Sequence, residues 1–229
     1  MKKNISIAID GPSGAGKSTL ARRCAKEFGF IYVDTGAIYR TVGLAAYRKG
    51  IDRKDELAVD EILPELNIEM CYNDAGEQCM ILNGEDVSTA IRMPEISICA
   101  SDVSAHPTVR AYLMDMQRDM AKKYSVIMDG RDIGTVVLPD ADLKIFLTAS
   151  VEARAQRRLL ELQGKGVETS FEEVLKDMIL RDEQDTNRAA APLMQAEDAV
   201  LVDTSDIDFE QSFELLASVI TENTGAERI

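Results

Sequence analysis

The chain has 229 residues, enough for one compact domain with a sizeable core, and hydrophobic residues make up 45% of it. Asp and Glu number 40 against 26 Lys and Arg, and this formal charge of −14 argues against polymeric nucleic acid as a partner, because phosphate polymers bind basic surfaces. No apolar run approaches the ~20 residues that span a bilayer, so we expect a cytoplasmic protein with no membrane partner.

The first predicted strand, residues 4–10, leads into a loop that matches G-x-x-x-x-G-K-[ST] in full, and a predicted helix follows at 17–28. In such a loop successive backbone N–H groups point at phosphates, and the helix N-terminus adds its positive dipole end. Lys17 is expected to reach the β- and γ-phosphates of ATP, and the Ser18 hydroxyl to ligate Mg²⁺. The expected phosphate-binding residues are Gly11, Pro12, Ser13, Gly14, Ala15, Gly16, Lys17, Ser18 and Thr19.

Further along the chain, strand-like and helical patterns alternate. Strands are expected at 30–33, 125–129, 143–148 and 199–203, with helical patterns that include 37–49 and 55–66. This alternation predicts an α/β fold, a P-loop three-layer sandwich in which helices cover both faces of a parallel central sheet.

Two segments interrupt the alternation. Residues 67–72 and 78–82 surround Asn73-Asp74-Ala75-Gly76, a hairpin signal, and predict a small antiparallel insertion at about residues 63–93. A Gly-containing connection, Gln163–Gly166, lies between two helical stretches and predicts a mobile lid at about 154–170. We expect both to belong to a single domain over residues 1–229.

Two polar segments follow predicted strands, where open parallel sheets bind ligands. The first runs from Asp34 to Arg40, and the second is Gly130-Arg131-Asp132. Asp129, at the end of a strand, is placed to orient Mg²⁺ through water, and a turn cap is an equally good interpretation of this residue.

Arginines on two predicted helices have a spacing that favours a lined cleft. From about Ser170, the stripe of Val174 and Met178 continues at Arg181, Asp185 and Arg188 if the helix is unbroken. In the preceding helix, Arg154 and Arg158 flank an apolar stripe, whereas Arg157 lies further round and is expected to pair with Glu161.

The remaining chemically reactive residues give weak signals. Four cysteines show no C-x-x-C spacing and no companion histidines, so we expect reduced thiols: Cys24, Cys71, Cys79 and Cys99. The one histidine, His106, excludes a multi-histidine metal site, and its position beside Pro107 indicates a loop residue.

Taken together, five segments resemble the bacterial cytidylate kinase family of nucleoside monophosphate kinases. They occur in that family's order and the resemblance covers essentially the whole chain: Gly11–Ser18, Asp34–Arg40, Ser101–Arg110, Gly130–Thr135 and Arg181–Arg188. The first is common to many families, and the other four are far more specific. Thr35 stands where the family often has serine, which keeps a hydroxyl.

The resemblance implies a (d)CMP kinase that uses Mg²⁺ and ATP, with the insertion binding the monophosphate and the lid covering the ATP phosphates. It implies roles for three sets of residues: the acceptor phosphate would be held by Arg40, Arg131 and Arg188, the sugar by Arg181 and Asp185, and the base by Ser101, Arg110 and Asp132. Thr35 would also contact CMP, and Arg154 and Arg158 would contact the transferring phosphoryl group. Lys17, Arg131 and Arg188 complete the expected catalytic set, and the expected partners are the small nucleotides ATP, CMP and dCMP, bound by a monomer.

Two alternatives stay open at this point. A P-loop kinase with an alcohol acceptor would need a base, and Asp34 is placed to serve. A nucleotide-binding module without turnover would also carry the loop. A GTPase is disfavoured, because the sequence has no Asn followed by Lys and no D-x-x-G element.

Overall fold

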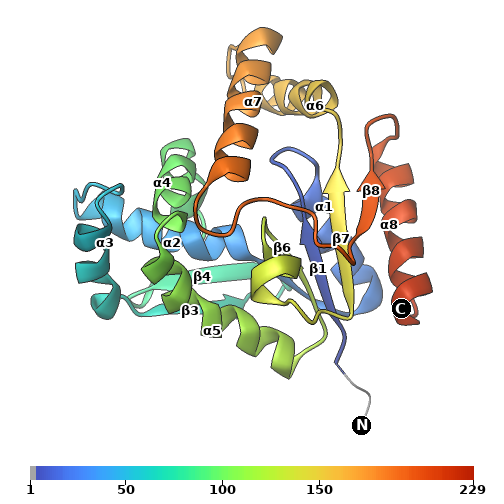
Figure 1. The fold of residues 1–229 in the computed structure, drawn as a ribbon, viewed down its shortest axis with the longest axis horizontal. Coiled ribbons are helices and arrows are strands. Elements are labelled where there is room, and N and C mark those ends of the chain that lie inside the picture. The colour runs from blue at the N-terminus through green and yellow to red at the C-terminus, as the bar shows by residue number, and fades with distance from the viewer. Residues whose placement is uncertain (1–3) are drawn as a thin grey trace. The chain divides into compact units, whose positions relative to one another are not determined.

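The computed structural model describes residues 4–229 (Figure 1). Contacts divide the chain into two compact units. The first unit comprises the residues up to Tyr32 together with Ala121–Ile229, and the second unit is Val33–Met120. The chain therefore leaves the first unit within one strand and returns to it within one helix.

A five-stranded sheet of order β2-β6-β1-β7-β8 organises the first unit. Its strands are β1 (Ser6–Asp10), β2 (Ile31–Asp34), β6 (Val126–Asp129), β7 (Leu143–Thr148) and β8 (Val200–Asp203). β1 pairs in parallel with both β6 and β7, and β7 pairs in parallel with β8. Side chains of the central strands are buried almost throughout, as expected when helices cover a parallel sheet.

Two helices pack on this sheet, α1 (Lys17–Phe28) and α8 (Phe209–Thr224), and their apolar faces share one core with β1, β6 and β7. In Figure 1, α8 (red) runs alongside β8. A separate small core joins α6 (Val151–Gly164) to α7 (Phe171–Asn187) around Ala155 and Met178. α7 starts at a capping box in which Ser170 and Glu173 bond each other's backbone N–H groups.

The second unit has its own core, formed by helices and a three-stranded antiparallel sheet of order β3-β4-β5. The helices are α2 (Thr35–Arg48), α3 (Glu56–Ile62), α4 (Pro94–Ser104) and α5 (Pro107–Lys123), of which α5 ends in the first unit, with 3-10 turns η1 (Leu63–Glu65) and η2 (Ala90–Arg92). The strands are β3 (Ile68–Tyr72), β4 (Gln78–Leu82) and β5 (Glu85–Asp86). α2 and α4 meet at Gly43, where an added Cβ would lie 2.9 Å from the backbone nitrogen of Ala100.

The parallel central sheet and the small antiparallel sheet confirm the predicted α/β class. The helix expected over 55–66 becomes 3-10 after Ile62, because Pro64 lacks the N–H that would continue the α-helix. The stripe expected to reach Arg188 along one helix stops earlier: α7 ends at Asn187, and Arg188 has an extended backbone. The three-stranded sheet lies within residues 63–93, while the single-domain organisation, the insertion and the lid stay predictions. Within residues 4–229, every helix is too short or too polar to cross a bilayer.

Candidate functional site

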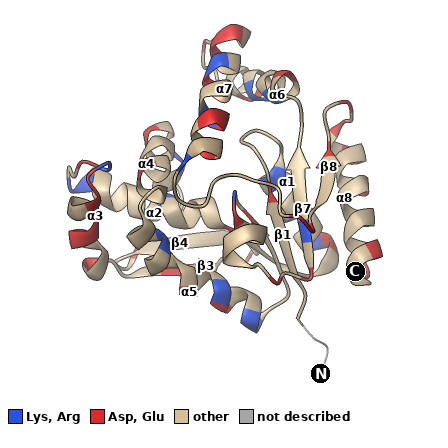
Figure 2. Cartoon of the chain, in the orientation of Figure 1, with Lys and Arg blue, Asp and Glu red and all other residues tan. Residues whose placement is uncertain are grey.

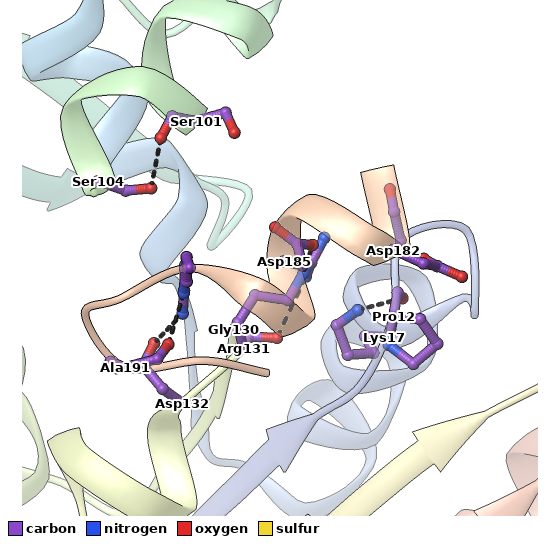
Figure 3. Close-up of polar contacts among 12 residues, drawn as sticks. Pro12, Lys17, Ser101, Ser104, Gly130, Arg131, Asp132, Asp182, Asp185 and Ala191 are labelled. Carbon is purple, nitrogen blue, oxygen red and sulfur yellow. Dashed lines mark hydrogen bonds and ion pairs between the residues drawn. The ribbon is translucent and has the colours of Figure 1, made fainter. Parts of the chain in front are cut away.

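The phosphate loop joins β1 to α1, as the motif predicts. Gly11 has a φ of 149°, and a Cβ there would lie 1.9 Å from the carbonyl oxygen of Leu147, so only glycine fits beside β7. Gly16 adopts the left-handed conformation at the N-cap of α1. Lys17 is buried, and its Nζ donates to the carbonyl oxygen of Pro12 at 2.7 Å (Figure 3).

Ser18 and Asp129 come together although they are far apart in the sequence. The Ser18 hydroxyl donates to Asp129 Oδ2 at 2.7 Å, and the Tyr32 hydroxyl donates to Asp129 Oδ1 at 2.8 Å. Asp129 is the last residue of β6, next to β1, which explains why it faces the start of α1. A hydroxyl and a carboxylate are the hard oxygen ligands that Mg²⁺ prefers, so these residues fit the ion together with ATP phosphates. Within residues 4–229 no cluster of three His, Cys, Asp or Glu side chains could hold a metal by itself.

The positive charge beside the loop is poorly solvated. Burial lowers the pKa of Lys17 well below its ordinary value, and the positive charge of Arg131 lowers it further. Asp129 and Asp10 act in the opposite direction. A desolvated ammonium next to a guanidinium is stabilised by an incoming anion, so this part of the first unit suits a phosphate group.

Asp10 is a residue of this site that the sequence analysis missed. It is buried at the end of β1, and its Oδ1 and Oδ2 accept from the backbone nitrogens of Ile133 and Gly134, both at 2.7 Å. These bonds hold the start of the π-helical turn η3 (Ile133–Val137), directly after Arg131 and Asp132. Burial raises the pKa of Asp10 to about 6, although both backbone bonds lower it. Its position immediately before Gly11 was the only sequence signal.

Two ion pairs organise the segment that follows β6. Arg131 Nε donates to Asp185 Oδ2 at 2.7 Å and its Nη1 to the carbonyl oxygen of Gly130 at 3.2 Å (Figure 3). Arg188 Nη2 lies 3.3 Å from Asp132 Oδ1. Burial opposes ionisation of Asp185, but the charge and hydrogen bond of Arg131, with the charges of Arg181 and Arg188, together outweigh it, and the pKa of Asp185 lies below its ordinary value.

One charged residue of α7, Arg181, differs from the prediction because it is exposed. Acidic and basic residues intermix along this helix (Figure 2). Arg181, expected on the cleft face, is an exposed residue, although it is close enough to Asp185 to help lower the pKa of that carboxyl group. The neighbouring Asp182, which the sequence analysis did not select, points toward α6 and the phosphate loop instead.

The two arginines of the predicted lid differ sharply in their surroundings. Arg154 is buried, its Nη1 and Nη2 donate to Asp182 at 3.0 and 2.6 Å, and its other bonds go to the carbonyl oxygens of Ser13 and Ala149, both at 2.9 Å. Arg158 is an exposed residue whose Nη1 donates to Glu161 at 2.7 Å. Arg157, expected to pair with Glu161, donates instead to Thr204 at the end of β8.

In the second unit, Asp34 and Arg40 form the start of α2. Asp34 Oδ1 caps the helix by accepting from Ala37 N at 2.9 Å, and Oδ2 accepts from Arg40 Nη2 at 2.9 Å. Gly36 leaves room for this pair, since a Cβ there would lie 3.1 Å from both side chains. Arg40 Nε is buried and has no hydrogen-bond partner among residues 4–229. Thr35 is buried beside them.

The residues expected to read the base also lie in the second unit, except for Asp132. Arg110 is buried, donates from Nη1 to the carbonyl oxygen of Ser104 at 3.4 Å, and lies over the Tyr39 ring with its central carbon 5.6 Å from the centroid. Ser101 is exposed on α4, and its carbonyl oxygen accepts from the Ser104 hydroxyl at 3.0 Å. His106 is buried between α4 and α5 and bonds the carbonyl oxygen of Arg53, a structural role.

The structure thus gathers many of the expected residues within each unit, whereas Arg158 and Arg181 are exposed. In the first unit the phosphate loop, Asp129, Arg131, Asp185 and Arg154 are linked through bonds or charge to one another or to the loop. In the second unit Thr35 and Arg40 lie together at the start of α2, while Arg110 and Ser101 lie near Ser104.

Comparison with known proteins identifies close relatives over nearly the full length. The family model "Cytidylate kinase" matches residues 7–222. A cytidylate kinase of Syntrophotalea carbinolica is 46% identical over 97% of this chain and 94% of its own, and one of Citrifermentans bemidjiense is 48% identical over 96% and 94%. A cytidylate kinase of Caldicellulosiruptor bescii is 49% identical over 91% of this chain and 92% of its own.

Proposed function

The chain belongs to the cytidylate kinase family, and on this premise we propose that it transfers the γ-phosphoryl group of ATP to CMP or dCMP, giving ADP and CDP or dCDP. The observation that carries the proposal is the buried ammonium of Lys17 in the phosphate loop, close enough to the Arg131 guanidinium for that charge to lower its pKa. Phosphoryl transfer requires mainly that the protein position the reacting groups and supply positive charge. Lys17 and Arg131 can do both next to the loop.

On the donor side, the loop N–H groups and Lys17 would bind the ATP phosphates. Mg²⁺, when bound, would neutralise phosphate charge. Ser18 and Asp129 would hold the ion or its water ligands. In this chain Lys17 Nζ contacts the Pro12 carbonyl oxygen, so binding of a phosphate would replace a neutral acceptor by an anionic one.

On the acceptor side, the arginines are already oriented by carboxylates. Arg131 donates from Nε to Asp185 and from Nη1 to Gly130. A guanidinium group has five N–H donors, so further donors of Arg131 are available to a phosphate. Arg188 would contribute alongside it. The unpartnered, buried Nε of Arg40 is a costly group that a phosphate oxygen would satisfy.

For the nucleoside, we assign Asp132 and Arg110 to cytosine, with Ser101, and Arg181 with Asp185 to the sugar; Thr35 would also contact CMP. Cytosine offers an amino donor at N4 and acceptors at N3 and O2, which match a carboxylate and a guanidinium. Uracil would place its O4 acceptor against the carboxylate, a mismatch that can cost several kcal/mol.

The reaction needs no general base, because the attacking phosphate oxygen is anionic at neutral pH. Lys17, Arg131 and Arg188, with the lid arginines Arg154 and Arg158, would stabilise charge on the transferring group as the oxygen attacks in line. Arg158 would have to leave Glu161 to do so. The roles of the insertion at about 63–93 and the lid at about 154–170, and a monomeric state, belong to this proposal.

The alcohol-acceptor alternative has less support. Asp34, the base it would need, has one carboxylate oxygen on the N-cap bond to Ala37 and the other on Arg40. Both carboxylate oxygens of Asp34 are thus already engaged in hydrogen bonds, which leaves the group poorly placed to accept a proton from an alcohol. A higher rate with cytidine than with CMP would revive this alternative.

The test is a set of initial rates at fixed Mg·ATP with CMP, dCMP, UMP, AMP and cytidine. CMP and dCMP are expected to give the highest kcat/KM and cytidine no turnover. A panel in which UMP or AMP exceeds CMP would contradict the assignment of Asp132 and Arg110 to cytosine.

Lys17→Ala provides the control for the donor side. Removing a preorganised donor of this kind typically costs ~3–4 kcal/mol of transition-state stabilisation, so the variant should lose more than ~100-fold in kcat while keeping the wild-type circular dichroism spectrum. Wild-type rates in this variant would remove the phosphate loop from the mechanism.

A further inference from the structure

Two cysteines in the second unit lie directly opposite each other, although the sequence spacing gave no sign of a pair. They belong to the hairpin of β3 and β4 (Figure 1), in which the antiparallel register pairs Cys71 with Cys79. The Cys79 thiol donates to the carbonyl oxygen of Glu77 at 3.7 Å. Both cysteines are free thiols in this structure.

The ladder position of this pair suits a disulfide. Asn73 N donates to the Glu77 carbonyl oxygen at 3.0 Å and Asn83 N donates to the Asn67 carbonyl oxygen at 2.8 Å, one at each end of the hairpin. Hydrogen-bonded and non-hydrogen-bonded pairs alternate along an antiparallel ladder, which makes the cysteines a hydrogen-bonded pair with Cα atoms about 5.5 Å apart. Disulfides span Cα separations of about 4.4–6.8 Å, so this separation lies within the range that a disulfide bridges.

Both sulfur atoms lie on the outer face of the small sheet. Met80 and Leu82 on the other face are buried in the core of the second unit, whereas Cys71 is exposed and Cys79 half-buried. The other two cysteines contrast with them: Cys24 and Cys99 are fully buried in different units, and burial raises the pKa of Cys24 to about 12. Oxidants in solution therefore meet the hairpin pair first.

We propose that Cys71 and Cys79 form a reversible disulfide when the protein meets a low-molecular-weight disulfide such as oxidised glutathione. One cysteine thiolate attacks the small disulfide, forms a mixed disulfide and releases one glutathione thiolate. The second cysteine thiolate then attacks the protein sulfur of that mixed disulfide and releases the other. The two cysteines lose two electrons and two protons, and the oxidant accepts both electrons and both protons as two glutathione thiols.

The residues around the two cysteines affect how fast the disulfide forms and how easily it is reduced. Slight desolvation of the otherwise exposed thiol, then the neighbouring Cys79, Asp86 of β5 and Glu69 of β3, raise the pKa of Cys71. Less thiolate is present at neutral pH, so the reaction accelerates as the pH rises. Opposed Cβ atoms on a sheet are about 4.5–5.5 Å apart, slightly wider than in a disulfide, so closing the bond strains it and favours easy reduction.

The hairpin also contacts Asp34, the N-cap residue of α2, through Gln78, the neighbour of Cys79. Gln78 Oε1 accepts from Asp34 N at 2.8 Å and its Nε2 donates to the Asp34 carbonyl oxygen at 3.2 Å. The Cys71–Cys79 disulfide would therefore form next to a residue that is bonded to the backbone at the start of α2.

The experiment uses the full chain, incubated with oxidised glutathione, quenched with iodoacetamide and digested after glutamate residues. Cleavage after Glu77 separates the two cysteines unless they are bonded, so a linked pair of peptides identifies the disulfide. We expect wild type to lose two hydrogen atoms in mass, to yield the linked peptides, and to recover fully with dithiothreitol.

Cys71→Ser and Cys79→Ser are the matched controls. Each keeps one hairpin thiol and is expected to stop at a mixed disulfide that adds one glutathione. Wild type that carries glutathione on both hairpin cysteines without linked peptides, or a disulfide that includes Cys24 or Cys99, would overturn the proposal.

Discussion

Asp10 illustrates how a single buried carboxylate positions several functional groups. Each of its oxygens accepts from one backbone nitrogen at the start of η3. The charge of Asp132 raises the pKa of Asp10, and the charge of Lys17 lowers it. An ionised group with two such bonds fixes the loop that carries Arg131 and Asp132, at the expense of burying its charge. The raised pKa of Asp10, about 6, expresses that cost.

Asp10→Asn should therefore change the pH dependence of stability. Because the pKa of Asp10 is higher in the folded protein than its ordinary 3.8, the folded state binds the proton more tightly, and wild type gains stability as the pH falls from about 7 to about 4. The free energy of unfolding of wild type relative to the variant should rise by about 3 kcal/mol over this interval. Urea unfolding of both proteins at a series of pH values measures it, and a difference independent of pH would show that Asp10 titrates normally.

At the scale of elements, α6 and α7 are joined to the phosphate loop through Arg154. Its guanidinium bonds Asp182 of α7 and the carbonyl oxygen of Ser13, so the loop and the helix pair share one buried cation. Arg158, on the same helix, is exposed and its ion pair with Glu161 is local. Two arginines that the sequence treats alike are thus expected to contribute differently.

Arg154→Ala should destabilise the protein by about 3 kcal/mol, because it removes one partner of a largely buried ion pair. Arg158→Ala should change the free energy of unfolding by less than about 0.5 kcal/mol, as for other exposed pairs, while lowering kcat. Thermal or urea unfolding and initial rates of both variants separate the two effects. Equal stability losses would contradict the structural role of Arg154.

The contact between α2 and α4 gives a second prediction at this scale. Gly43→Ala places a methyl group 2.9 Å from a backbone nitrogen of α4, so the helix carrying Ser101 must shift. We expect a loss of about 1–3 kcal/mol in stability and a raised KM for CMP. Gly164→Ala in α6 is the control: nothing lies within 4 Å of its Cβ position, and replacing a helical glycine should add about 0.5 kcal/mol.

For the whole molecule, the charge of −14 limits which phosphates can bind. Asp and Glu outnumber Lys and Arg by 40 to 26, and arginines of the candidate site are themselves paired with carboxylates, as Arg131 is with Asp185 and Arg40 with Asp34. The protein should therefore show no retardation of duplex DNA in a gel at about 50 mM salt, conditions that favour non-specific binding. Retardation that weakens steeply with added salt would contradict this expectation.

The sequence by itself determined the phosphate loop, most strands and helices and the antiparallel hairpin, because each depends on residues close together in the chain: glycine spacing, apolar periodicity and a turn signal. Only the tertiary structure decided which distant groups meet. The parallel order of β1, β6 and β7 brings their carboxyl ends together, and this places Asp129 on Ser18 and sets Asp10 against η3. Likewise Asp182 of α7, which lies outside the predicted stripe, meets Arg154, because the positions at which two helices face each other depend on their shared core and not on the period of either one.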